Sequence, residues 1–214
     1  MGNMKVIKDS APIILGYIPI AIAFGAIAKE YLGLNALLMS MLVFAGASQF
    51  IALQLLIKGS SAAMIVLTTF IVNLRHILMS SYLSKFIKTN AFKKAIIAFG
   101  ITDETFAIGS KNPNSSYQLK LNFIAYFSWI FGTALGLAFG YLIPKSLIDI
   151  LPFALITLFI FILVDGIKCN RDILVAIVAG VFSVLLSFMR GWNVLIAALI
   201  ACFVGYIMEV SKGE

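Results

Sequence analysis

Apolar residues of the chain gather into eight segments that short polar stretches separate. The segments run Ala11–Ala28, Asn35–Ile57, Ala62–Leu83, Ala95–Ile108, Leu121–Ile143, Ile148–Val164, Ile173–Met189 and Val194–Met208. A helix that crosses a bilayer needs about 20 mainly apolar residues, and several segments approach or exceed that length. The pattern predicts an all-α, polytopic integral membrane protein with six to eight hydrophobic segments, in one transmembrane domain over residues 1–214.

Two of the segments are predicted to be broken or re-entrant. The first, Ala11–Ala28, contains Pro19, which lacks a backbone donor and clashes with the preceding turn. We therefore expect a kink or break near Tyr17–Pro19 that frees backbone groups to line a cavity. The fourth, Ala95–Ile108, has only 14 residues and carries two adjacent acids in its middle, which cannot face lipid.

Small residues mark two other segments. Asn35–Ile57 is predicted to be a full span, although its middle holds Ala45, Gly46, Ala47 and Ser48, which permit close helix approach or local unwinding. Leu121–Ile143 carries a predicted packing strip of small residues spaced four apart. The strip consists of Gly132, Gly136 and Gly140. A five-residue similarity between Ala21–Gly25 and Gly136–Gly140, offset by 115 positions, hints at a weak repeat of about residues 1–115 and 116–214.

The third segment, Ala62–Leu83, is apolar enough to span yet contains Arg75 and the only histidine of the chain. If this segment is a helix with 100° per residue, four polar side chains lie within a stripe about 60° wide on its surface, and Arg75 points about 100° away from the stripe. The stripe consists of Thr69, Asn73, His76 and Ser80. A guanidinium in hydrocarbon costs at least about 2.5–3.5 kcal/mol, so both polar faces must be covered by protein or by a wet cavity.

Topology can be predicted from lysine and arginine positions. If the first and fourth segments re-enter and the other six cross, 12 basic residues fall on one side and 3 on the other. The larger group is Lys5, Lys8, Lys29, Lys85, Lys88, Lys93, Lys94, Lys111, Lys120, Lys168, Arg171 and Lys212, and the smaller is Lys58, Lys145 and Arg190. Eight crossings give 8 against 7, and re-entry of the fourth segment alone gives 10 against 5. The positive-inside rule favours the first arrangement and makes the lysine-rich side cytoplasmic, with both termini there.

Composition supports a membrane protein and excludes other classes. The chain is 62% hydrophobic and only 12% charged, about half the charged fraction of soluble domains. A net charge of +7 then indicates loop lysines near anionic lipid and not nucleic-acid binding. The two cysteines have no metal-ligand spacing, and the sequence contains no phosphate-binding loop, zinc-protease motif or nucleophile elbow. We expect no cofactor, no metal and no enzymatic activity.

Arg75, Asp103 and Glu104 are predicted to form one electrostatic unit. Arg75 lies 13 residues from Ala62, about 20 Å along a helix, so it cannot snorkel to the interface and needs a partner at depth. The two acids are the only ones in apolar surroundings nearby in sequence. One would pair with Arg75 and leave the other for a substrate ammonium or a proton; a purely structural ion pair is the alternative.

Four further polar residues and Pro19 are candidate substrate or coupling residues. His76 could carry a proton, although a neutral interhelical hydrogen bond is the simpler interpretation. Asn73, Ser48 and Gln49 could contact a substrate, with interhelical bonding and packing as alternatives.

Several stretches in the first 110 residues resemble the AzlC family, the large subunit of bacterial branched-chain amino acid exporters. They are Gly16–Gly25, Phe44–Phe50, Asn73-Leu74-Arg75-His76 and Thr102-Asp103-Glu104. The resemblance implies export of leucine, isoleucine, valine and, as a further candidate, methionine. It also implies a small AzlD-type membrane partner and a location in the bacterial cytoplasmic (inner) membrane.

The combined prediction is a secondary transporter subunit that exports hydrophobic amino acids, with coupling to a proton gradient. A carboxylate of the substrate would meet a cation or a helix N-terminus, and its ammonium would meet an acid. A non-transporting membrane assembly factor and a small-ion channel are the alternatives.

Overall fold

In a computed structural model of the chain, all regular structure in the described residues is helical. The structure describes residues 2–150, 153, 157, 160, 163–164, 167–189 and 192–210. Most of the predicted sixth segment, Ile148–Val164, therefore lies outside the described residues. Of the helices in the described part, three are long and apolar enough to cross a membrane, over Met4–Leu32, Ala62–Ser84 and Ser115–Leu142.

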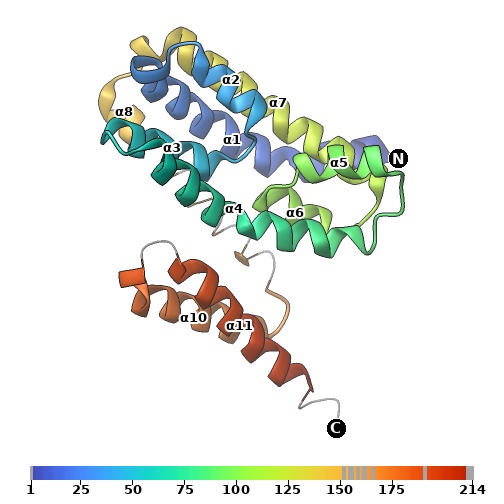
Figure 1. Cartoon of the computed structure of the whole chain (residues 1–214). Helices are drawn as coiled ribbons and strands as arrows, with labels where there is room; N and C mark the ends of the chain where they lie inside the picture. Colours follow the sequence, from blue (N-terminus) through green and yellow to red (C-terminus); the bar gives the residue numbers. More distant parts are fainter. Residues whose placement is uncertain are drawn as a thin grey trace.

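Helix α1, Gly2–Leu32, is continuous through Pro12 and Pro19 (Figure 1). The predicted break near Tyr17–Pro19 is wrong, and so is the re-entry of this segment. A proline costs one backbone hydrogen bond and some strain, and the tight packing of one face of α1 against α7, Ser115–Phe139, offsets that cost. Tyr17, Ile20 and Phe24 on this face are buried.

Glycine makes the contact between α1 and α7 possible. A Cβ at Gly132 would lie 2.7 Å from Ala21 Cβ, and one at Gly136 would lie 2.9 Å from the backbone nitrogen of Ala26. A Cβ at Gly25 would in turn lie 3.0 Å from the nitrogen of Leu137. The predicted small-residue strip is thus confirmed, with α1 as its partner. Residues later in α7 contact residues later in α1, so the two helices run parallel.

The second apolar segment is not a full span. It divides into α2, Asn35–Leu42, and α3, Gly46–Ile57, with the chain extended between them. Ala36 near the start of α2 and Leu53 near the end of α3 belong to one buried cluster with Phe24 and Leu137. The segment therefore enters the bundle and folds back toward the end where it began (Figure 1). Of the two options that the small residues permitted, local unwinding is the one that occurs.

The fourth apolar segment is also interrupted, as predicted. It divides into α5, Ala91–Phe99, and α6, Asp103–Gly109, and it follows the long helix α4, Ala62–Ser84. This second hairpin enters from the opposite end of the bundle, where α1 and α7 begin (Figure 1). A Cβ at Gly100 or at Gly109 would meet the side chain of Asn122 or Gln118 on α7, so α5 and α6 both pack closely against the first part of that helix.

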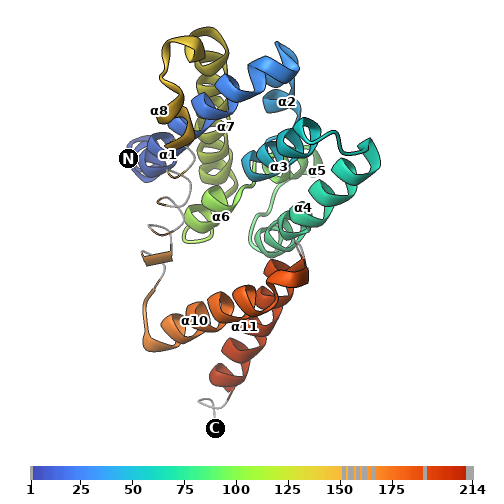
Figure 2. The same ribbon diagram turned by 90° about the vertical axis from the view of Figure 1, so that its left-hand side faces the viewer.

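The C-terminal part of the chain forms a separate pair of helices. Residues Gly140–Leu142 form a 3-10 turn that leads to the short α8, Lys145–Ile150, and further on come α10, Asn170–Leu185, the 3-10 turn Ser187–Met189 and α11, Trp192–Val210. Figure 2 shows α10 and α11 side by side and apart from the α1–α7 bundle. The predicted seventh and eighth segments are thus both helical.

The fold changes which segments re-enter, and the loop after the first segment changes side, but the other loops of residues 1–150 keep their predicted side. With α1, α4 and α7 crossing and the two hairpins folding back, eight lysines of residues 1–150 fall on the side of the N-terminus and three on the other. The first group is Lys5, Lys8, Lys85, Lys88, Lys93, Lys94, Lys111 and Lys120, and the second is Lys29, Lys58 and Lys145. Lys29 changes side relative to the prediction from sequence. The lysine-rich side remains the one expected to be cytoplasmic.

Cysteine labelling tests this arrangement. In a background with Cys169 and Cys202 replaced by serine, cysteines placed at Lys88 and Lys111 should react only from the cytoplasmic side, and one at Lys58 only from outside. Impermeant maleimide applied to intact cells and to inverted vesicles measures the sidedness. Opposite accessibility of Lys88 and Lys111 would show that α5–α6 crosses and would contradict the re-entrant hairpin.

Substitution of Gly136 tests the contact between α1 and α7. Gly136→Ala should lower the free energy of unfolding by about 1–3 kcal/mol, because the new methyl group meets backbone atoms that cannot move aside. Thermal unfolding of the purified protein in detergent measures the change. Gly180→Ala is the matched control, since a Cβ there meets nothing within 4 Å and alanine favours the helix. Equal melting temperatures for the two variants would contradict the close contact.

Candidate functional site

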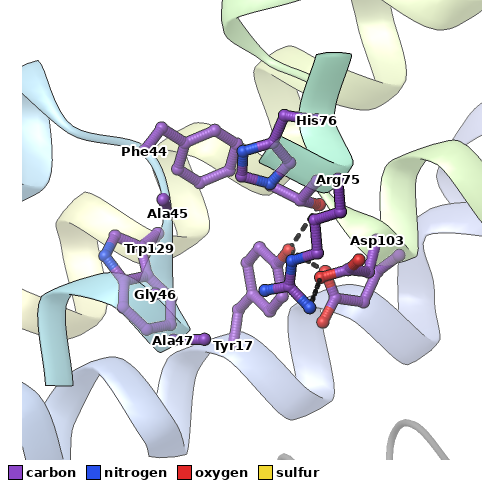
Figure 3. Close-up of a pocket in the computed structure, with 11 residues that line it drawn as sticks. Tyr17, Phe44, Ala45, Gly46, Ala47, Arg75, His76, Asp103 and Trp129 are labelled. Atoms are coloured by element: carbon purple, nitrogen blue, oxygen red, sulfur yellow. Dashed lines mark hydrogen bonds and ion pairs between the residues drawn. The ribbon is translucent and has the colours of Figure 1, made fainter. Parts of the chain in front are cut away.

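The interruptions of both hairpins meet at a small pocket between α1, α4 and α7. Its volume is about 20 Å³, enough for a water-sized group and not for an amino acid. Tyr17, Arg75, His76 and Trp129 line it from the long helices (Figure 3). The hairpins supply the remaining lining residues, which are Phe44, Ala45, Gly46, Ala47, Thr102, Asp103 and Glu104.

The α2–α3 hairpin presents the start of a helix to the pocket. Ala45 precedes α3 in an extended conformation, and no side chain in the described part of the chain caps this helix N-terminus. The first backbone N–H groups of a helix have no partner within the helix, and the helix dipole places partial positive charge there. Gly46 allows the close approach of Trp129, because a Cβ at Gly46 would lie 2.6 Å from the indole ring. This end of α3 can therefore accept an anionic group.

The α5–α6 hairpin positions the two acids at the first turn of α6. Thr102 and Thr105 form a reciprocal capping box, in which each hydroxyl accepts a hydrogen bond from the other residue's backbone N–H. Thr105 also donates to the carbonyl of Gly100 at 3.1 Å, which satisfies the interrupted backbone. Asp103 and Glu104 follow the cap directly, where a helix N-terminus favours negative charge.

Arg75 on α4 forms an ion pair with Asp103, with 2.9 Å between Nη1 and Oδ2. The predicted pairing between Arg75 and one of the two acids is therefore present. The two side chains are 30% and 24% exposed, so the pair lies at the wall of the pocket and not in the packed core. The Nε of Arg75 is buried and makes no hydrogen bond among the described residues. Arg75 thus keeps one donor group for another acceptor.

Glu104 interacts with α1 and not with Arg75. The Tyr17 hydroxyl donates to Glu104 Oε2 at 2.5 Å and lies 2.7 Å from the Thr102 hydroxyl. Glu104 is 3% exposed and Tyr17 4% exposed. The two adjacent acids therefore have different environments: one faces a cation, and the other faces a neutral hydroxyl in a buried site.

A hydrogen-bond network behind the pocket fixes the α2–α3 hairpin. The Trp129 indole N–H donates to Gln49 Oε1 at 2.8 Å, and Gln49 Nε2 donates to Ser40 at 3.0 Å. The Ser40 hydroxyl lies 2.9 Å from that of Thr133 on α7. All of these side chains except Trp129 are completely buried. Gln49 thus holds Trp129 in place and does not reach the pocket itself.

The remaining candidates from the sequence divide between the pocket and its surroundings. His76 lines the pocket beside Arg75, so both predicted polar faces of α4 border the same space. Ser48 donates to Asn73 Oδ1 at 2.6 Å, which joins α3 to α4 and matches the alternative of interhelical bonding. Pro19 is partly exposed and is absent from the pocket lining. The broken first segment that would have placed it there does not exist.

Sequence reasoning missed Tyr17, Thr102, Phe44 and Trp129 as site residues. Tyr17, Phe44 and Thr102 lie beside the proline, the small residues and the acids that carry the local sequence signals, but have no comparable signal of their own. Trp129 had no local signal. It reaches the pocket through the packing of α7, with its ring 5.4 Å from that of Tyr17. Among the described residues, no group of histidine, cysteine, aspartate and glutamate is suited to a metal ion.

The fold and the pocket define a class: a polytopic, all-α membrane protein whose polar pocket is built where two interrupted helices meet. Comparison with known proteins gives the family. The AzlC protein family profile matches residues 12–143, and the chain belongs to this family. No solved structure matches the chain.

Individual relatives extend this result. An uncharacterized membrane protein of Archaeoglobus fulgidus is 35% identical over 96% of this chain and 93% of its own length. The inner membrane protein YgaZ of Escherichia coli is 35% identical over 62% of this chain and 59% of its own length. A protein of Bacillus subtilis named branched-chain amino acid transport protein AzlC is 29% identical over 72% of this chain and 63% of its own length.

A double-mutant cycle tests the ion pair. Arg75→Ala and Asp103→Ala should each destabilise the protein, because each leaves a charge at depth without its partner. The double variant should be less affected than the sum of the two, with a coupling energy of about 0.5–3 kcal/mol. Unfolding in detergent measures all four proteins. Strict additivity would mean that the pair contributes nothing to the folded state.

Proposed function

We propose that the protein is the pocket-bearing subunit of a secondary transporter that exports branched-chain amino acids. One observation carries the proposal: a cation, two acids and an uncapped helix N-terminus meet at the interruptions of two hairpins inside a membrane protein. Ionisable groups at depth in a membrane protein mark substrate or ion pathways, and interrupted helices form transporter binding sites. The name of the Bacillus subtilis relative, a branched-chain amino acid transport protein, supports the substrate class.

The α-carboxylate of the substrate is expected to bind Arg75 and the start of α3. Arg75 Nε is a buried donor without a partner in the described structure, and the residues at the start of α3 line the same pocket. Anions bind at helix N-termini for this reason. The ammonium of the substrate is expected to reach Glu104, whose carboxylate has no cation of its own.

Apolar groups supply the remaining contact. Phe44 and Trp129 form one wall of the pocket together with the small residues 45–47. A branched aliphatic side chain fits such a wall because its burial removes apolar area from water. The pocket as it stands is too small for leucine, so binding requires movement of at least one hairpin.

The direction of transport, the coupling to protons and the small AzlD-type partner are further parts of the proposal. They rest on the family resemblance. The long helix α4 offers an exposed apolar surface that lipid or another membrane subunit would cover, with Val66, Phe70 and Leu78 each more than half exposed.

Reconstituted transport tests the function. Proteoliposomes that contain the full chain, with and without the partner subunit, should exchange labelled leucine, isoleucine and valine and should not exchange lysine. Arg75→Gln should abolish the exchange, since the substrate carboxylate loses its charged partner. Membrane conductance without amino-acid flux would favour the ion-channel alternative, and the absence of both would favour an assembly factor.

A further inference from the structure

Glu104 is the acid of the pocket that pairs with no cation of the described residues. It is 3% exposed, and its carboxylate accepts a hydrogen bond from the Tyr17 hydroxyl. The nearby guanidinium of Arg75 is paired with Asp103. Among the described residues, no lysine, arginine or histidine nitrogen lies within 4.0 Å of the Glu104 carboxylate. Figure 3 shows the Arg75 side chain between the Tyr17 ring on one side and Asp103 on the other.

Burial and the lack of a cation determine which ligands this carboxylate can hold. An ionised carboxylate removed from water needs a positive partner, or else it retains its proton. Within the pocket, the titratable and charged groups that face it are Tyr17 from α1, Arg75 and His76 from α4, and Asp103 from α6. The α3 and α7 segments that border the pocket contribute no titratable side chain to its lining.

The geometry points to Glu104 as the residue at which a proton and the ammonium group of the substrate compete, so that one proton is exchanged for each amino acid. This inference rests on the proposed function and adds the coupling residue and the stoichiometry. Asp103 is less suited to the role because Arg75 already supplies its counter-charge at 2.9 Å. A single carboxylate that must hold either ligand, but not both, couples the two fluxes without a separate coupling site.

The exchange balances in charge and atoms. When the amino acid binds from the cytoplasm, the Glu104 O–H proton leaves to that side and the substrate ammonium takes its place against the carboxylate. When the site opens to the outside, the zwitterion leaves and the carboxylate takes up a proton from that side. No covalent bond of the substrate changes. Each cycle moves one neutral zwitterion out and one positive charge in, so the transport is expected to respond to membrane potential as well as to pH.

Proton release on binding tests the competition. Calorimetry of leucine binding to the purified protein, in two buffers of different ionisation enthalpy, should show about one proton released per leucine at neutral pH. Glu104→Gln keeps an acceptor for the Tyr17 hydroxyl but cannot ionise. Its proton release should fall to near zero, and its leucine affinity should weaken at least about tenfold and lose its pH dependence. In proteoliposomes, a pH gradient should no longer drive uptake of leucine by this variant.

Two further variants serve as controls. Glu30→Gln makes the same chemical change at an exposed position of α1 and should leave proton release intact. His76→Gln identifies the alternative proton site in the same pocket: loss of release in this variant, with release retained in Glu104→Gln, would overturn the assignment.

Infrared spectroscopy separates this inference from the proposed function. Without substrate, the wild type should show the C=O band of a protonated buried carboxyl group, and Glu104→Gln should lack it. Failure of the wild type to bind any branched-chain amino acid would overturn the proposed function, whereas a wild type without a Glu104-dependent carboxyl band would overturn this inference.

Discussion

Glycine lets the backbones of α1 and α7 touch over residues 18–26 of α1 and 132–140 at the end of α7, and both interrupted hairpins pack against that pair. Gly25, Gly132 and Gly136 replace side-chain contacts with backbone contacts, which is how helices associate where lipid is as apolar as leucine. The parallel pair then presents Tyr17 and Trp129 at the same level, with rings 5.4 Å apart. The pocket has its base on this pair, so the position of its polar groups follows from the helix contact.

Membrane helices are interrupted only where protein or a wet cavity satisfies the freed backbone groups. At the α5–α6 interruption, Asn122 on α7 donates to the Ile97 carbonyl at 2.8 Å, and Thr105 donates to the Gly100 carbonyl. At the α2–α3 interruption, Tyr126 on α7 donates to the Met41 carbonyl at 2.9 Å. Of the groups left over, the start of α3 and the Arg75 Nε border the pocket, whereas Gln118 Oε1 lies outside its lining. A ligand in the pocket could use the first two.

Helical class, the glycine strip and the pairing of Arg75 with a neighbouring acid were predictable from sequence, because each depends on local pattern or on charge neutrality at depth. The continuity of α1 was not, since a proline's local cost does not reveal the packing that offsets it. The choice between Asp103 and Glu104 as the partner of Arg75 depends on Tyr17, a contact across 87 positions of sequence. Trp129 enters the site for the same long-range reason.

The proposed repeat of residues 1–115 and 116–214 stays a prediction. Its two matching stretches, around Gly25 and Gly136, contact each other's helices, and both need small side chains at the contact.

A long helix followed by a folded-back hairpin occurs twice before α7, first as α1 with α2–α3 and then as α4 with α5–α6, and the two units enter from opposite ends (Figure 1). Their interruptions come together at Tyr126, whose ring lies 5.4 Å from Phe44 and 5.7 Å from Phe99. Transporters often place a binding site between such oppositely oriented units. The α5–α6 hairpin enters from the lysine-rich end of the bundle and the α2–α3 hairpin from the other end, and residues of both hairpins line the pocket. Glu104 joins the α5–α6 hairpin to Tyr17 on α1, and Asp103 joins it to Arg75 on α4. In the proposed function Glu104 and Arg75 contact the substrate, so substrate binding changes the same interactions that hold this hairpin in place.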